Sequence, residues 1–440
     1  MINLITETSK YLMILLIAFY TFFNFRFFSL PDFKRKRVIC ARQNQAMFLI
    51  HLLAYVIIYL KTEDEKILVF YGAQVVFFLA YIYLCRLFYR NISRLLVNNA
   101  CMLLCTGLIM LTRISFGRAV RQFVIVAAAA AVTLVVPWII GRVWQLSHGA
   151  FVYGILGLAL LGAVWVKGST TFGAQLSLEL GGISIQPSEF VKITFVLFIA
   201  SMFYRSLSFG SVAAATGVAA AHVLILVASK DLGSALLFFV TYLFMLFVAT
   251  SSWLYLGAGL AAGSGAAMLA YQVFPHVQTR VAAWQNPWLD MDNKGYQITQ
   301  SLFAIGTGGW FGMGLYRGMP YKIPVVEKDF IFAAISEELG GIFALCILLI
   351  CLGCFLQFMM IAGQLQAVFF KLTAFGLGVV YITQVFLTVG GVTKFIPSTG
   401  ITLPFVSYGG SSILSTFILF NVMQGLYLIK RNEEEDDEEG

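Results

Sequence analysis

The feature that most constrains the fold is a succession of apolar stretches, each about long enough to cross a bilayer as a helix. A transmembrane helix needs about 17–25 mostly apolar residues. Charged residues make up only 11% of the 440-residue chain, whereas a soluble domain has about 25%. The sequence therefore predicts an all-α polytopic membrane protein with thirteen spans: Tyr11–Phe28, Ala46–Leu60, Ile67–Cys85, Asn98–Thr112, Phe123–Ile140, Gly149–Val166, Phe190–Tyr204, Val212–Ala228, Ser234–Thr250, Leu254–Phe274, Phe330–Ala362, Ala367–Gly390 and Ile413–Ile429.

Clusters of Lys and Arg indicate how these spans are oriented. They gather at residues 34–42, 86–94 and 430–431, and loops rich in Lys and Arg stay on the cytoplasmic side of a membrane. An odd number of spans places the two ends of the chain on opposite sides. We therefore expect an external N-terminus, an external central loop at 275–329 and a cytoplasmic acidic tail at 432–440.

The central loop is the longest polar interruption of the apolar pattern, and its tryptophans and glycines favour an ordered functional loop. Its cations lie on the outer side, against the positive-inside bias: Arg280, Lys294, Arg317, Lys322 and Lys328. This placement suggests an anionic ligand, and ordinary solvated loop charges are the alternative. The composition gives no indication of nucleic-acid binding.

Four polar segments fall on the predicted outer side: Lys167–Glu189, Lys230–Ser234, the central loop and Phe395–Ser412. Non-helical backbone at membrane depth is tolerated only inside protein or beside a water-filled cavity. We therefore predict a polar cavity open to the outside. Glu189, Lys192 and Asp231 lie at span edges, where charges are costly and often functional. A purely structural pairing of Glu189 with Lys192 is equally open.

Asp290, in the Pro/Trp/Asn-rich turn Asn286–Asp290, is the leading candidate for a general base, because loop carboxylates held by a rigid scaffold are good general bases. Asp292 is a close second. Asp329 is expected to cap the helix that begins at Phe330. The chain contains no Ser/His/Asp order, phosphate-binding P-loop or metal-ligand spacing, and His276 and the seven cysteines are interpreted as packing residues.

Several motifs resemble the SEDS family (shape, elongation, division and sporulation), to which FtsW, RodA and SpoVE belong. They are QPSEFVK at 186–192, KDLGS at 230–234, NPWLD at 286–290 followed by GYQITQSLFAIGTGGWFGMGL, EKDFIFAAISEELG at 327–340 and FIPSTGITLPFVSYGGSS at 395–412. The resemblance runs from about Asn98 to Arg431. It implies a ten-helix catalytic core at 96–431, preceded by about three accessory helices at 1–95.

The resemblance implies a peptidoglycan glycosyltransferase that polymerises lipid II at the outer face of the bacterial plasma membrane. In this interpretation Asp290 is the catalytic base. Cations would hold the diphosphate of the substrate: Arg280, Arg317, Lys322, Lys328 and Lys394. Further substrate contacts are expected from Glu189, Lys192, Asp231, Ser407, Gly409 and Gly410. No cofactor or resident metal is expected, although a divalent cation bridging the diphosphate is compatible with the sequence.

The resemblance also implies a partner, a class B penicillin-binding protein. Two other functions fit the same features: a lipid II flippase or transporter, and a non-catalytic scaffold for a transpeptidase. The chain departs from the family pattern at Leu176-Ser177, at Lys230 and at Met291. These departures bear on the subfamily and leave two alternatives open, a main elongation or division enzyme and a divergent paralogue.

Overall fold

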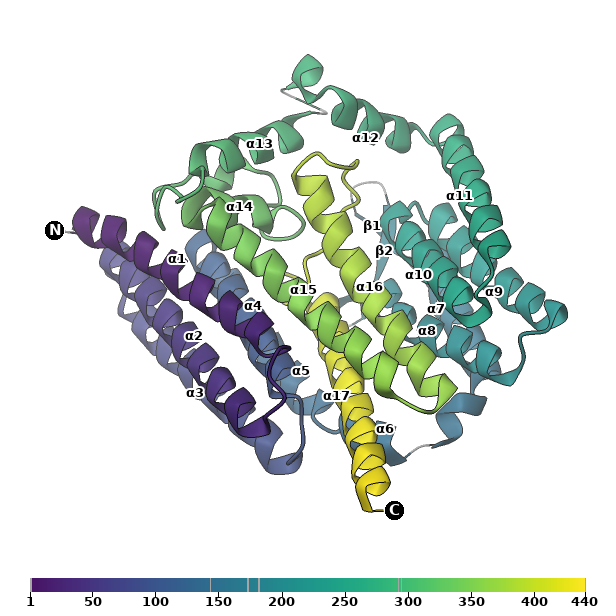
Figure 1. Ribbon diagram of the computed structural model, residues 1–440. Coiled ribbons are helices and arrows are strands. Elements are labelled where there is room, and N and C mark those ends of the chain that lie inside the picture. Colours follow the sequence, from purple (N-terminus) through teal and green to yellow (C-terminus); the bar gives the residue numbers. More distant parts are fainter. Residues whose placement is uncertain are drawn as a thin grey trace. The chain divides into compact units, whose positions relative to one another are not determined.

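The computed structural model describes residues 2–142, 144–171, 174–180, 183–291, 293 and 295–439. Its helices and strands follow in this order (Figure 1): α1 (Ile2–Arg26), α2 (Phe33–Thr62), α3 (Glu65–Phe88), α4 (Arg94–Ile114), α5 (Phe116–Thr133), α6 (Val136–Arg142), the short 3₁₀ helix η1 (Trp144–His148), α7 (Ala150–Lys167), β1 (Ser169–Thr171), β2 (Ala174–Leu180), β3 (Ile183–Ile185), α8 (Pro187–Arg205), α9 (Phe209–Ala228), α10 (Leu232–Thr250), α11 (Trp253–Val273), α12 (Pro275–Gln285), η2 (Pro287–Asp290), α13 (Tyr296–Gly308), η3 (Pro320–Lys322), α14 (Ile331–Leu339), α15 (Gly341–Gln364), α16 (Val368–Val392) and α17 (Gly410–Glu439).

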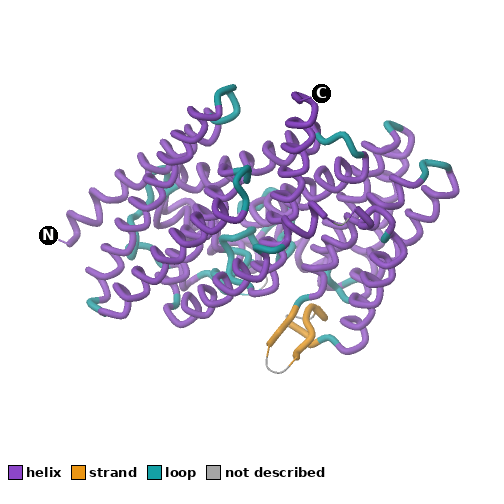
Figure 2. The backbone as a smooth tube through the Cα atoms, turned by 90° about the horizontal axis from the view of Figure 1, so that it is seen from below, coloured by secondary structure: helices purple, strands orange, loops and turns teal. Residues whose placement is uncertain are grey.

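Over these described ranges, thirteen helical segments are long and apolar enough to cross a membrane. The polytopic helical fold predicted from the sequence is thus confirmed. One difference is a small antiparallel sheet of order β1-β2-β3, which is drawn in orange in Figure 2. It lies where the sequence predicts the polar segment 167–189.

The chain divides into two compact units. The first comprises Met1–Val132, Arg280–Cys354 and Val385–Gly409. The second comprises Thr133–Thr279, Phe355–Gln384 and Gly410–Gly440.

Helix α4 is the central helix of the first unit, and every residue from Leu95 to Thr112 is buried. Its two adjacent amides are bonded to neighbouring helices of the same unit. Asn98 donates to the Cys40 carbonyl of α2 at 2.9 Å. Asn99 donates to Asn24 of α1 at 2.8 Å and accepts from the Tyr20 hydroxyl at 3.0 Å. Polar side chains buried among apolar helices require such partners, so these bonds fix how α1 and α2 pack on α4.

A break between α14 and α15 replaces the single helix that the sequence predicts over Phe330–Ala362. Gly340 adopts φ +97° at this break, a conformation that only glycine adopts readily. A methyl group on Gly340 would come within 2.6 Å of the Gly312 backbone nitrogen. Because the helix stops here, Ile342 can donate to the Trp310 carbonyl at 3.1 Å. The break therefore lets residues 309–314 of the central loop pack directly against the end of α14.

In the second unit, α8 packs against α7, α10 and α17. It begins at Pro187, as the sequence predicts, because proline fits the first turn of a helix. The small sheet is joined to this unit by a backbone hydrogen bond from Gln175 of β2 to the Ser229 carbonyl, 3.0 Å long. The sheet thereby lies beside the start of α10, close to Asp231.

Candidate functional site

The residues predicted from the sequence fall into both units. Asp290, Arg280, Arg317, Lys322, Lys328, Lys394, Ser407 and Gly409 belong to the first, whereas Glu189, Lys192, Asp231 and Gly410 belong to the second.

In the first unit, a cluster of polar groups joins α5 to the residues just before α14 and just before α17. Arg118 of α5 forms an ion pair with Glu327. The Tyr408 amide donates to the Glu327 carbonyl at 2.7 Å, and the Ser407 hydroxyl donates to the Lys328 carbonyl. The segments around Glu327 and Tyr408, which lie far apart in the sequence, are therefore fixed against each other.

Gln122, one turn further along α5, strengthens this cluster. Its amide nitrogen donates to the Ser407 carbonyl at 3.1 Å, and its amide oxygen accepts from the Gly409 amide at 3.3 Å. The Ser407 hydroxyl also accepts from the Leu403 amide at 2.9 Å. Ser407 and Gly409, both predicted as substrate contacts, are thus held by α5. In this structure Ser407 is buried and serves the loop's own hydrogen bonding.

Asp329 lies beside this cluster. Burial raises the pKa of its carboxyl group to about 6, while Arg280 and Lys328 act in the opposite direction. The expectation that Asp329 caps the next helix is wrong, because the cap position of α14 is Phe330, with no side-chain hydrogen bond. Asp329 is instead a largely buried acid close to two of the predicted cations, Arg280 and Lys328.

Two residues of α12 bond to the segment that contains Lys394, another predicted cation of the first unit. Arg280 donates to the Ser398 carbonyl at 3.2 Å, and the Trp284 indole donates to the Lys394 carbonyl at 3.2 Å. Lys394 itself has φ +59°, the left-handed conformation that ordinary residues rarely adopt. The bonds from α12 therefore anchor the segment 394–398, whose non-helical backbone confirms the sequence prediction for this stretch.

Asp290 ends the short helix η2, in a turn that folds back on itself. The Gly295 amide donates to the Asp290 carbonyl at 2.9 Å, and the Asn293 side chain donates to the Asp290 carboxylate at 3.0 Å. A methyl group on Gly295 would lie 2.1 Å from the Pro287 carbonyl oxygen, so this closure requires glycine. The carboxylate is half-buried. Asp292 and Lys294 lie outside the described residues.

The other two predicted cations of the loop have different surroundings. Lys322 is exposed, at the end of η3. Arg317 forms an ion pair with Glu7 of α1, a residue that the sequence analysis did not single out.

A second pair of carboxylates, Glu337 and Glu338, is buried at the end of α14. Arg113 donates to the Glu338 carboxylate at 3.0 Å, and the Gly318 amide donates to the same oxygen at 3.2 Å. Glu337 accepts from the Met319 amide at 2.9 Å. Burial raises the pKa of Glu338 to about 7, although the Arg113 charge opposes the shift.

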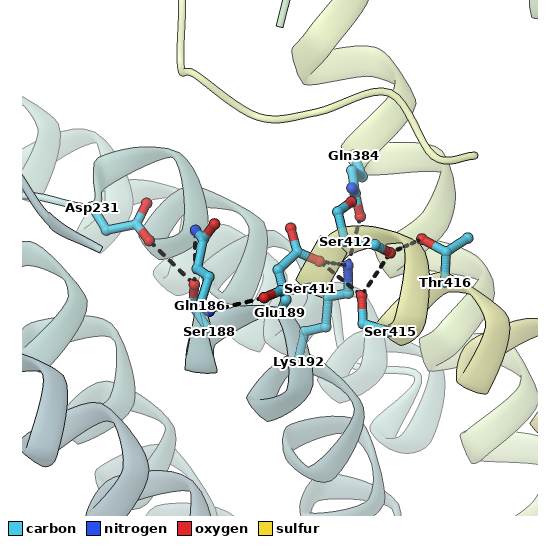
Figure 3. Close-up of polar contacts among 10 residues, drawn as sticks. All are labelled: Gln186, Ser188, Glu189, Lys192, Asp231, Gln384, Ser411, Ser412, Ser415 and Thr416. Atoms are coloured by element: carbon cyan, nitrogen blue, oxygen red, sulfur yellow. Dashed lines mark hydrogen bonds and ion pairs between the residues drawn. The ribbon is translucent and has the colours of Figure 1, made fainter. Parts of the chain in front are cut away.

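In the second unit, Glu189 and Lys192 form an ion pair of 2.5 Å within the first turns of α8. Lys192 also donates to Gln384 of α16 at 2.9 Å. The Ser415 hydroxyl of α17 donates to Glu189 at 2.9 Å. Figure 3 shows how these side chains converge from three helices. The structural pairing that the sequence left open is present, and it joins α8, α16 and α17.

Asp231 occupies the cap position of α10. Its carboxylate accepts from the Ser234 amide at 3.1 Å. It also accepts from the Ser188 hydroxyl at 3.4 Å (Figure 3). Burial raises its pKa. Near Ser188, the Gln186 amide donates to the Ser411 hydroxyl at 3.0 Å, one residue after Gly410. The helix starts of α8, α10 and α17 therefore meet in one polar layer, which contains Glu189, Lys192 and Asp231.

Comparison with known proteins decides what kind of chain carries these two clusters. The sequence model of the cell cycle protein family FtsW/RodA/SpoVE matches residues 93–432, a range that contains all the predicted site residues. The chain belongs to this family.

Relatives of this family member are found under all three names. Peptidoglycan glycosyltransferase RodA of Mycobacterium tuberculosis is 36% identical over 298 residues, covering 63% of this chain and 64% of the relative. Probable peptidoglycan glycosyltransferase FtsW of Saccharophagus degradans is 34% identical, covering 67% and 79%. Stage V sporulation protein E of Bacillus subtilis is 35% identical, covering 64% and 79%. The chain thus aligns with just under two thirds of the RodA relative's length.

Solved structures share the fold. A chain from a peptidoglycan synthase complex, studied for the structural coordination of polymerization and crosslinking, has a TM-score of 0.66 at 23% identity, covering 78% of this chain and 99% of that one. RodA of Thermus thermophilus has a TM-score of 0.59 at 23% identity, covering 78% and 97%. At this identity the likeness concerns the fold.

Arg118 and Gln122, which hold the first cluster together, were not predicted from the sequence. A signal for them was present. The segment between the predicted spans ending at Thr112 and beginning at Phe123 lies on the predicted outer side, yet it carries Arg118 and Arg121. Cations placed against the positive-inside bias would have indicated a functional segment here, as they did in the central loop.

Proposed function

We propose that the protein is a peptidoglycan glycosyltransferase that polymerises lipid II at the outer face of the bacterial plasma membrane. The observation that carries the proposal is the family match over residues 93–432, together with relatives named as peptidoglycan glycosyltransferases. A class B penicillin-binding protein is the proposed partner, which the similarity to a chain of a synthase complex for polymerization and crosslinking supports.

In the proposed reaction, Asp290 removes the proton from a sugar hydroxyl of the acceptor. The oxygen attacks the anomeric carbon of the donor, and the bond from that carbon to the diphosphate oxygen breaks. The lipid diphosphate leaves with the bonding electrons and needs charge stabilisation more than protonation. A single base opposite an anionic leaving group suits inversion at the anomeric carbon.

The cations of the first unit are the proposed source of that stabilisation. Arg280 and Lys328 lie close enough to Asp329 to oppose the rise of its pKa, and Trp284 of α12 holds the backbone of Lys394. The exposed Lys322 is available for the outer part of the substrate. Arg–phosphate and Lys–phosphate hydrogen bonds are charge-assisted and strong. The proposed roles of Glu189, Lys192 and Asp231 are to shape the polar layer at the helix starts of the second unit.

The decisive test is polymerisation of lipid II by the purified protein, compared with Asp290→Asn. Asparagine keeps the size and turn preference of aspartate but removes its basicity. Loss of a positioned base lowers a rate by roughly 10²–10⁴-fold. We therefore expect Asp290→Asn to abolish detectable glycan polymer while insertion and partner binding persist, and Asp292→Asn, the matched control, to retain most of the rate.

Other outcomes would point elsewhere. Full activity in Asp290→Asn with loss in Asp292→Asn would transfer the role to Asp292. Transport of lipid II across vesicles without polymer formation would favour a flippase, and absence of both would favour a scaffold. A divalent cation bridging the diphosphate would appear as activity lost in EDTA and restored by Mg²⁺.

A further inference from the structure

The first turns of α1 contact residues 311–317 of the central loop, which we call the 311–317 segment. Glu7 forms ion pairs with Arg317 and, at 2.5 Å, with Lys10. Lys10 also donates to the Gly312 carbonyl at 3.3 Å. The rings of Tyr11 and Phe311 lie 5.7 Å apart. Charge, hydrogen bonding and ring packing thus join one end of α1 to this segment.

The 311–317 segment is in turn fastened to α14. The Met313 amide donates to the Glu337 carbonyl and the Gly314 amide to the Glu338 carbonyl, both at 2.9 Å. Gly312 adopts φ +73°, and a methyl group there would lie 2.5 Å from the Glu338 carbonyl oxygen. The segment therefore lies against the backbone of the two buried glutamates, one of which Arg113 binds.

Helix α1 is itself fixed further along its length. Tyr20 and Asn24 bond to Asn99 of α4, and Asn24 lies against Gly353 of α15. A helix anchored near its C-terminal end can hold a loop at its N-terminal end. Residues 2–92, which include α1, precede the part of the chain that the family model matches. The contact is therefore between an added element and the family core.

We propose that Glu7 and Lys10 of α1 are positioning residues that hold the 311–317 segment in place. In this proposal Arg317 serves to dock α1 on the segment, through its ion pair with Glu7. The proposal rests on the proposed glycosyltransferase function only for its effect on activity. It assigns the N-terminal helices a part in arranging the core, beyond the accessory role expected from the sequence. It also gives Arg317 a task other than binding diphosphate.

The two roles of Arg317 make opposite predictions for a charge exchange. If Arg317 binds the substrate, glutamate at this position is harmful whatever stands at position 7. If Arg317 docks α1, then Glu7→Arg combined with Arg317→Glu rebuilds the pair with reversed charges.

The experiment compares the full-length chain in lipid nanodiscs with Glu7→Arg, Glu7→Gln, Arg317→Glu and the exchanged double variant. Hydrogen–deuterium exchange reports on the Met313 and Gly314 amides. Breaking a partly exposed ion pair should speed their exchange about five-fold, and the double variant should restore it. In polymerisation assays the single variants should raise the KM for lipid II with little change in kcat, and the double variant should restore KM.

Glu65→Gln, an exposed glutamate in the first turn of α3, is the matched control and should change neither measurement. Unchanged exchange in all single variants would overturn the docking of α1. Restored exchange with an unrestored KM would overturn the assignment of Arg317 and return it to the substrate. If the wild type makes no polymer, the proposed function fails, but the exchange measurements still decide whether α1 holds the segment.

Discussion

Two acids of the central loop, Asp290 and Asp329, differ in how much of their surroundings the sequence predicts. The turn around Asp290 could be predicted, because Asn, Pro, Asp and Gly each favour turn conformations. The surroundings of Asp329 could not, since they come from Arg280 and from segments distant in the sequence. The ion pairs of Arg317 with Glu7 and of Arg118 with Glu327 could not be predicted either, because their partners lie far apart in the sequence.

The buried Glu338 predicts a specific dependence of stability on pH. Its pKa is about 7 in the folded protein, against an ordinary value of 4.5. The folded state therefore holds this proton over a range in which the unfolded chain releases it. Stability from this group is present below about pH 4.5 and is lost as the pH rises to about 7. We expect Glu338→Gln to flatten this decline.

The measurement is the Tm of the detergent-solubilised protein between pH 5 and 8. The wild type should lose a few degrees over this range, with Asp329 contributing a smaller decline of the same sign. Glu65→Gln should behave like the wild type. Identical slopes in the wild type and in Glu338→Gln would show that Glu338 does not titrate in this window.

At the scale of elements, the long apolar spans were predictable and their interruptions less so. The break at Gly340 depends on residues 309–314 packing against it, which no local pattern in the helix reveals. The small sheet did have a local signal, because polar and apolar residues alternate through Gln175–Glu179. The segment was nevertheless predicted as a polar loop without strands. The start of α8 at Pro187 was predicted because its signal is local.

The Glu189–Lys192 pair predicts how firmly α8, α16 and α17 are joined. Lys192 is almost fully buried, and removing one member of a buried ion pair costs about 3–5 kcal/mol, because the other charge is left uncompensated. Lys192→Met should therefore lower the Tm strongly. The double variant Glu189→Gln/Lys192→Met should be more stable than Lys192→Met alone. A double variant as unstable as the sum of the two single changes would contradict the pairing.

At the scale of the whole molecule, the number of spans and the basic clusters predict which side of the membrane each loop faces. Asn293 lies in the central loop and is exposed, and the seven native cysteines are buried. Asn293→Cys should therefore react with an impermeant maleimide added to intact cells, whereas Asn432→Cys, in the tail, should react only after permeabilisation. The reverse pattern would invert the orientation, and wild-type cells give the background.

The burial of α4 has a consequence for how the chain enters the membrane during synthesis. Asn98 and Asn99 would face lipid if α4 were inserted alone, and unsatisfied amides in hydrocarbon cost several kcal/mol each. Their partners lie on α1 and α2, which leave the ribosome before α4, since a chain emerges from its N-terminus. When α4 reaches the insertion machinery, the groups that receive its amides are therefore already in the bilayer. The order of the helices in the gene is thus also a workable order of assembly.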